Sequence, residues 1–165
     1  IYGGIYDWDE AMNYQDTIGD ICPPGWHIPS PSEWARMLAT LDSVQKTISH
    51  YTSGSNFPNY KGTNVGEALK EAGTQHWADP NFANNTHGFA ALPNAYRYVW
   101  GGWSVFNPSV GGTVPLFDRR QARFWTSQPV NSTRAMHYLL ENLRRSIGYH
   151  WGNKVSGAAV RCIMD

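Results

Sequence analysis

Residues 22–34 of the chain read CPPGWHIPSPSEW, and this stretch carries its clearest helix start signal. Ser30 is suited to cap a helix that begins with Pro31, and Glu33, three residues after the cap, completes a capping box. Apolar side chains then follow at helical spacing, at Trp34, Met37, Leu38 and Leu41. The pattern predicts a helix that begins at Pro31 and ends between Leu41 and Ile48.

Two shorter helices are indicated by the same kind of signal. Residues 64–67 read NVGE, which forms a second capping box, and apolar residues then lead to Gly73 as a stop signal. Near the start of the chain, Asp7 with Glu10 three residues later predicts a short helix through Met12.

From residue 88 onward the pattern changes to short apolar or aromatic segments separated by Gly, Pro and Asn. The segments read FAAL, AYRYVW, VPLF, ARFWTS, RAMHYLL, IGYHW and AAVRCIM. Segments of this length with turn residues between them are typical of antiparallel strands. The sequence therefore predicts one α+β domain, residues 1–165, in which helices come first and short antiparallel strands follow.

The composition excludes several classes of protein. The 13 Lys and Arg residues balance 13 Asp and Glu residues, so the chain has no basic surface for nucleic acid. No apolar run approaches the roughly 18 residues that a membrane-spanning helix needs. The 8 Trp, 9 Tyr and 6 Phe residues instead supply the apolar material of a packed core.

The two cysteines, Cys22 and Cys162, lie almost at opposite ends of the chain. They are too far apart for a local zinc knuckle or a C-x-x-C redox pair. They are either two unrelated buried thiols or one disulfide. The disulfide is favoured, because each cysteine is flanked by strongly patterned sequence. Closing so long a loop would stabilise the protein by about 4–5 kcal/mol before strain is subtracted. A disulfide indicates an oxidising compartment.

Six motifs occur in the order found in one family: YGGIYDWDEAM, CPPGWHIPSPSEW, LKEAG, GFAALPNAYR, FWTS and GAAVRCIMD. From Tyr2 to Asp165 the chain therefore resembles the Fibrobacter succinogenes major paralogous domain family, which is common in surface proteins of gut Bacteroidetes. The resemblance implies a C-type-lectin-like fold, with two main helices packed on short, twisted strands and long loops. It also implies a Cys22–Cys162 disulfide, and similarity to formylglycine-generating enzymes and to the variable proteins of diversity-generating retroelements.

The chain departs from that family at two places. Residues 94–97 read NAYR where the family usually has Gly-Gly-Tyr-Arg. Residues 141–154 read ENLRRSIGYHWGNK where the family is usually rich in Asn, Ser and Tyr. In the retroelement-diversified relatives, side chains between the C-terminal strands vary and contact the ligand, so residues 136–154 are the candidate site.

Within that segment we expect one face to carry the ligand, with Trp151 as its anchor, because rings and arginines dominate binding hot spots. The expected contact residues are Tyr138, Asn142, Arg144, Tyr149, His150, Trp151 and Asn153. The alternative is a solvated hairpin, and the strand register decides which side chains face outward. Other tryptophans are expected in the core (Trp26, Trp34, Trp125) or beside glycines at the surface (Trp100, Trp103).

Neither metal binding nor catalysis is indicated by the motifs. The six histidines are His27, His50, His76, His87, His137 and His150, and none has the spacing of a zinc site. Residues 128–130 read QPV, without the carboxylate of a calcium-dependent lectin, and no Trp-Asn-Asp occurs. No nucleophile elbow or phosphate-binding loop is present either. His27 is expected in the core or at a helix cap rather than as a base.

These patterns lead to one functional expectation and two alternatives. We expect an extracellular or cell-surface module of a larger protein, such as an adhesin or receptor, that needs no calcium or other cofactor. Its partner is expected to be a protein or glycan on a host, bacterial or phage surface. The alternatives are an enzyme or enzyme accessory on the formylglycine-generating scaffold, and a structural knob of a fibre or pilus.

Overall fold

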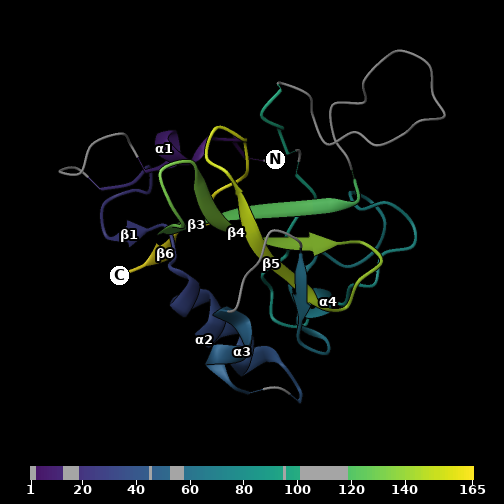
Figure 1. The fold of residues 1–165 in the computed structure, drawn as a ribbon. Helices are drawn as coiled ribbons and strands as arrows, with labels where there is room; N and C mark the ends of the chain where they lie inside the picture. The colour runs from purple at the N-terminus through teal and green to yellow at the C-terminus, as the bar shows by residue number, and fades with distance from the viewer. Residues whose placement is uncertain (1–2, 13–18, 45, 53–57, 95, 101–118) are drawn as a thin grey trace, which may run out of the picture.

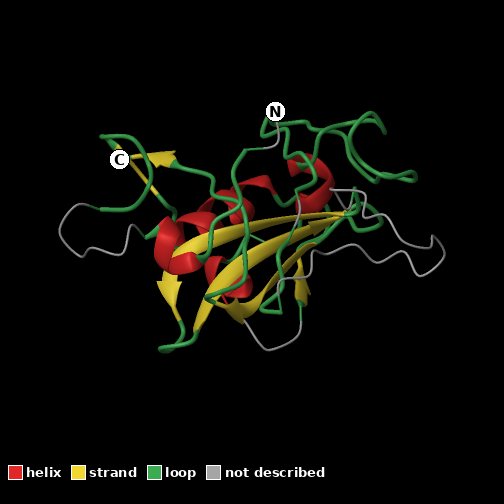
Figure 2. Cartoon of the chain, turned by 90° about the horizontal axis from the view of Figure 1, so that it is seen from above, coloured by secondary structure: helices red, strands yellow, loops and turns green. Residues whose placement is uncertain are grey.

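The computed structural model describes residues 3–12, 19–44, 46–52, 58–94, 96–100 and 119–165. The fold is α+β, as expected, and its centre is an antiparallel sheet of strand order β2-β5-β4-β3 (Figure 1). The strands are β2 (Asn59–Lys61), β3 (Gln121–Pro129), β4 (Arg134–Glu141) and β5 (Ile147–Asn153). The longer strands lie side by side and twist relative to one another (Figure 2). They confirm three of the seven predicted strand segments.

The main helix, α2 (Pro31–Leu41), confirms its predicted start signal. Ser30 Oγ accepts from the Glu33 N–H, and the Glu33 carboxylate accepts from the Ser30 N–H at 2.8 Å, so both halves of the capping box form. The helix ends at Leu41, the nearer of the two expected limits. α3 (Ile48–Thr52) packs beside it (Figure 1).

The two shorter predicted helices, α1 and α4, begin where expected, but α4 ends earlier than expected. α1 (Trp8–Ala11) is capped by the Asp7 carboxylate, as expected. α4 (Val65–Leu69) begins after Asn64 but stops before Gly73. The prediction of a capping box at the start of α4 was wrong. The Asn64 side chain instead accepts hydrogen bonds from the N–H and the hydroxyl of Ser43.

The remaining predicted strand segments within the described residues contribute single bridges and one two-residue strand. FAAL and AYRYVW give only single bridges, at Ala91 and Arg97, and VPLF lies outside the described residues. The last segment gives bridges at Ala158 and Ala159 and then β6 (Ile163–Met164). β6 pairs with β1 (Trp26–His27) in a separate two-stranded sheet.

The central sheet is buried on both faces. On one face, α2 packs through Trp34 and Leu38 against rings from all three long strands. On the other face, Trp125 and Ala135 pack against Trp8, Tyr96 and Ala158, which come from both ends of the chain and from the loop before β3. Burial on both faces removes the usual alternation of apolar and polar residues along a strand.

The disulfide predicted between Cys22 and Cys162 is present, with a Cα–Cα distance of 5.8 Å. Beside it, His27 bridges two carboxylates: its Nε2 lies 2.9 Å from Glu33 and its Nδ1 lies 2.6 Å from Asp165. These hydrogen bonds, that to Asp165 first, raise the pKa of His27. The histidine therefore ties the start of α2 to the last residue of the chain.

Three tryptophans test the predicted core. Trp34 and Trp125 are buried, as expected. Trp26 is not: it is 45 % exposed, and the expectation that it belongs to the core was wrong. The reason is the short β1–β6 pair, where Trp26 stands opposite Met164, itself 71 % exposed.

No helix within the described ranges is both long and apolar enough to span a membrane.

Candidate ligand-binding surface

The seven residues expected to contact a ligand do not form one exposed face. Four of them are buried, with relative exposures of 0 % for Tyr138, 6 % for Asn142, 2 % for Tyr149 and 7 % for His150. Arg144 is exposed, and Trp151 and Asn153 are partly exposed. The prediction of a single binding face was therefore wrong, and the candidate site has to be sought among the side chains that are exposed.

Tyr138 and Tyr149 are core residues because the register pairs them directly across β4 and β5. Their rings stack at 4.5 Å, and the Tyr138 ring lies 4.8 Å from Trp34 of α2. The Tyr138 hydroxyl donates to the Tyr51 carbonyl at 3.0 Å. Burial raises the pKa of both tyrosines, so their phenols stay neutral in the core.

Asn142 has a structural role in the turn between β4 and β5. Its Nδ2 donates to the carbonyls of Ala78 and Pro80, at 3.3 and 3.0 Å. Buried Lys70 supports the same turn, since its Nζ donates to the carbonyls of Glu141, Asn142 and Arg144 at 2.6–3.2 Å. Burial lowers the pKa of Lys70 to about 8. The turn is thus held from inside.

Arg144 stands on the outer side of this turn in a small exposed cluster. Its guanidinium lies 3.8 Å from the centre of the Tyr60 ring, and its Nε donates to Glu141 at 2.8 Å. Tyr60 donates to the same carboxylate, and burial followed by this bond raises the Tyr60 pKa. Leu143 beside them is 55 % exposed. Tyr60 was missed because β2 is far from the segment in sequence.

Trp151 and Asn153 lie near the other end of β5. Trp151 packs against the α2-side core while Arg134 of β4 covers its ring at 5.3 Å. Its Nε1 is buried and finds no acceptor in the described structure. Asn153 accepts from the N–H of Val155 and so shapes the turn after β5. Trp151 is therefore less accessible than the anchor we expected.

His150 faces the opposite side of the sheet and meets His137 there. The two imidazoles pair across β4 and β5 with ring centres 4.0 Å apart, and Arg123 Nη1 lies 3.3 Å from His137 Nε2. Burial, followed by the neighbouring His150 and Arg123, lowers the pKa of His137 well below its ordinary value. Burial and then Arg123 lower the pKa of His150 to about 4. We call Arg123, His137 and His150 the histidine cluster.

A row of three aromatic rings leads from the histidine cluster to the surface. Tyr96 covers Arg123 at 4.2 Å and lies 5.9 Å from His137. Tyr98 meets Tyr96 edge-on at 5.1 Å, and Trp100 stacks flat on Tyr98 at 4.5 Å with an angle of 4° between the planes. We call Tyr96, Tyr98 and Trp100 the ring ladder.

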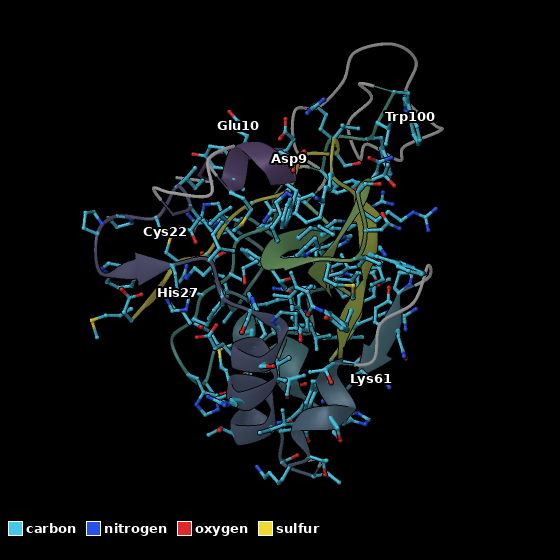
Figure 3. All side chains as sticks on the ribbon, turned by 60° about the vertical axis from the view of Figure 1, so that its left-hand side comes forward. Asp9, Glu10, Cys22, His27, Lys61 and Trp100 are labelled. Carbon is cyan, nitrogen blue, oxygen red and sulfur yellow. A yellow bond between two sulfur atoms is a disulfide. The ribbon has the colours of Figure 1, made fainter. Side chains whose placement is uncertain are left out.

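Trp100 is the exposed end of this ladder. Its relative exposure is 76 %, which confirms the expectation of surface exposure, whereas Trp103 lies outside the described residues. Figure 3 shows Trp100 far from Cys22 and His27, at the opposite side of the view. A large exposed ring that is already fixed in place offers contact area to a partner at low entropic cost.

The histidine cluster has a signal in the sequence that motif spacing alone does not reveal. Residues 137–138 read His-Tyr and residues 149–150 read Tyr-His. Two such mirror-image dipeptides fit an antiparallel register that pairs histidine with histidine and tyrosine with tyrosine. The structure has this register. Arg123 and the ladder tyrosines carry no comparable signal.

The described residues contain no group of three or more His, Cys, Asp or Glu side chains that could hold a metal ion. The histidine cluster supplies two imidazoles beside a permanently charged guanidinium, which opposes a cation. Three of its four ring nitrogens, His137 Nδ1 and both of His150, are buried without a hydrogen-bond partner in the described structure. The buried His137 ring lies against the base of the ring ladder, 5.9 Å from Tyr96.

Among the comparisons with known proteins, the chain matches a family model but no individual protein. A family model described as Fibrobacter succinogenes major domain matches residues 1–164. No curated protein and no solved structure matches the chain.

Proposed function

Because the chain belongs to the Fibrobacter succinogenes major domain family, we propose that it is a non-catalytic ligand-binding domain of C-type-lectin-like fold. It acts outside the cell, as a module of a larger adhesin-like or receptor-like surface protein, and needs no calcium. Its ligand is a protein or glycan on another surface.

The observation that carries the proposal is the exposed Trp100 on a ladder of fixed rings. The coplanar stack on Tyr98 orients the indole before any partner arrives. Tyr96 fixes the base of the ladder against Arg123 and His137. An exposed aromatic side chain with this degree of support is typical of a binding surface, and solvation alone does not require it.

The disulfide supports the proposed location. Cys22–Cys162 joins the N-terminal and C-terminal parts of the chain across 140 residues. Stable disulfides of this kind are characteristic of secreted and surface proteins, because cytosolic thiols are kept reduced.

The test compares Trp100→Ala with Trp26→Ala on a glycan array and on an array of secreted and surface proteins. Both tryptophans are exposed, but Trp26 lies in the β1–β6 pair, away from the ladder. We expect Trp100→Ala to weaken binding by about thirtyfold or more, since a hot-spot side chain contributes about 2 kcal/mol. Trp26→Ala should bind as the unmodified chain does.

The same arrays separate the other outcomes. Binding that a chelator abolishes contradicts the calcium-independent part of the proposal. Equal losses in the two variants place the ligand away from the ladder. No binding on either array, with the disulfide intact, rejects the ligand-binding function.

A further inference from the structure

A cavity of about 360 Å³ opens between three segments that are far apart in sequence: residues 3–6, 90–94 and 159–162. Its volume lies within the range of sites that take small molecules. Phe124 of β3 lines it, whereas the preceding residue, Arg123, belongs to the histidine cluster on the opposite face of the strand. None of the described residues that line the cavity belongs to the ring ladder.

Arg161 lines this cavity and also a smaller neighbouring pocket of about 140 Å³ that includes Phe89. Its guanidinium lies 4.5 Å from the centre of the Phe89 ring, and Nη2 donates to the Phe89 carbonyl at 3.2 Å. No carboxylate within the described ranges pairs with it. The ring and the carbonyl thus orient a guanidinium whose other N–H groups remain available.

Asn94 supplies a second donor. The residue lines the cavity although its relative exposure is only 3 %. Its Oδ1 accepts the Arg123 N–H at 2.9 Å, which leaves the Nδ2 amide group as the free end of the side chain. Among the described residues that line the cavity there is no Asp, Glu or His.

We propose that this cavity binds a small organic carboxylate. Arg161 takes the carboxylate, because a planar guanidinium matches its two oxygens, and Asn94 donates to the ligand from inside. One cation suits one negative charge, whereas a phosphate group usually meets several cations or a row of backbone N–H groups. The small residues of the walls, among them Gly3, Ala90 and Ala159, leave room for the group that carries the carboxylate.

The test is a titration of the ¹⁵N-labelled chain with two pairs of probes, followed by NMR. One pair is N-acetyl-glycyl-alanine and its C-terminal amide, and the other is glucuronic acid and glucose. We expect saturable shifts at Arg161 Nε–H and at the amides of Gly4, Ala90 and Ala159 with at least one acid. Neither neutral partner should produce them. The acid that binds identifies the source as a peptide end or a uronic acid.

Three variants make the test specific. Arg161→Gln should weaken binding about tenfold or more, as expected for a lost charge-assisted hydrogen bond. Ile21→Trp keeps the arginine but adds a bulky ring to the lining of the cavity, and it should also weaken binding. Arg36→Gln, on the exposed side of α2, is the matched control and should leave binding unchanged.

The proposal fails if no acid binds, if the neutral probes bind equally, or if Arg161→Gln binds as well as Arg36→Gln. This result is independent of the proposed function. Trp100→Ala should leave carboxylate binding unchanged, and Arg161→Gln should leave Trp100-dependent binding unchanged.

Discussion

The two faces of the central sheet carry opposite chemistry on the same strands. On the α2 side, Tyr138 and Tyr149 stack in a packed aromatic core. On the other side, their chain neighbours His137 and His150 are equally buried but leave three ring nitrogens without partners in the described structure. Buried polar atoms without partners cost free energy of folding. We therefore expect the α2 side to contribute more to stability than the histidine side, against which Tyr96 of the ring ladder packs.

The largest effect should come from the α2 side. Tyr138→Ala removes a fully buried ring and its hydrogen bond to Tyr51, so we expect the free energy of unfolding to fall by about 5 kcal/mol. His137→Ala, one residue away, should cost less than half as much, because it also removes an unpartnered polar atom. Urea unfolding of both variants measures the difference. Equal losses would show that the two faces contribute alike.

The next largest effect on stability should come from the apolar residues that pack over the histidine side of the sheet. Cys22 packs against the cluster of apolar residues on that side, so removing the disulfide loosens this cover first. We expect the double variant with Cys22→Ser and Cys162→Ser to lose about 4 kcal/mol, because the disulfide restricts the unfolded chain. Thermal unfolding with and without reductant measures it in the unmodified chain. Hydrogen exchange should rise at Trp125 before it rises at Tyr138, and the reverse order contradicts the comparison.

The smallest effect is a loss of stability in acid. His150 titrates near its ordinary pKa of about 6.5 when unfolded, but burial lowers its pKa to about 4 in the fold. The unfolded chain therefore binds the proton first, so stability is complete above about pH 6.5 and falls as the pH drops toward about 4. We expect a loss of about 2–3 kcal/mol from this group across that window.

The control for the acid experiment is a pair of variants. His150→Gln should reduce the pH dependence of urea unfolding between those limits but leave the part that comes from His137, whose pKa is also lowered. His87→Gln, at an exposed position, should leave the pH dependence unchanged. If the two variants respond alike, the buried histidine is not the group that titrates.

The parts of the fold that sequence predicted are those fixed by local chemistry. The capping box of Ser30 and Glu33 and the cap at Asp7 depend on residues three apart, and both form. The Cys22–Cys162 bond spans 140 residues, but it could also be predicted, because the chain has two cysteines and therefore one possible pairing. The capping box predicted at Asn64 does not form, because the side-chain oxygen of Asn64 accepts hydrogen bonds from Ser43, a residue 21 positions away.

The candidate site was harder to predict because it depends on which segments cover the sheet. We expected one face of β4 and β5 to be open, but Trp8, Tyr96 and Ala158 cover the face opposite α2. These residues come from three separate parts of the chain, and no local pattern in β4 or β5 indicates them. Tyr138 and His150 are thus both buried, although they belong to opposite faces.

The disulfide has a mechanical consequence. When tension is applied to the two ends of the chain, it passes through the covalent Cys22–Cys162 link and bypasses the 140-residue loop that the link closes. The bridge between Tyr6 and Ala158, the helix α1 and the β1–β6 pair are loaded first, because the residues before Cys22 and after Cys162 lie outside that loop. The sheet, the ring ladder and most of the cavity wall lie within the shielded loop. Under a pull that peels away its first residues, the domain keeps its central fold and the exposed Trp100.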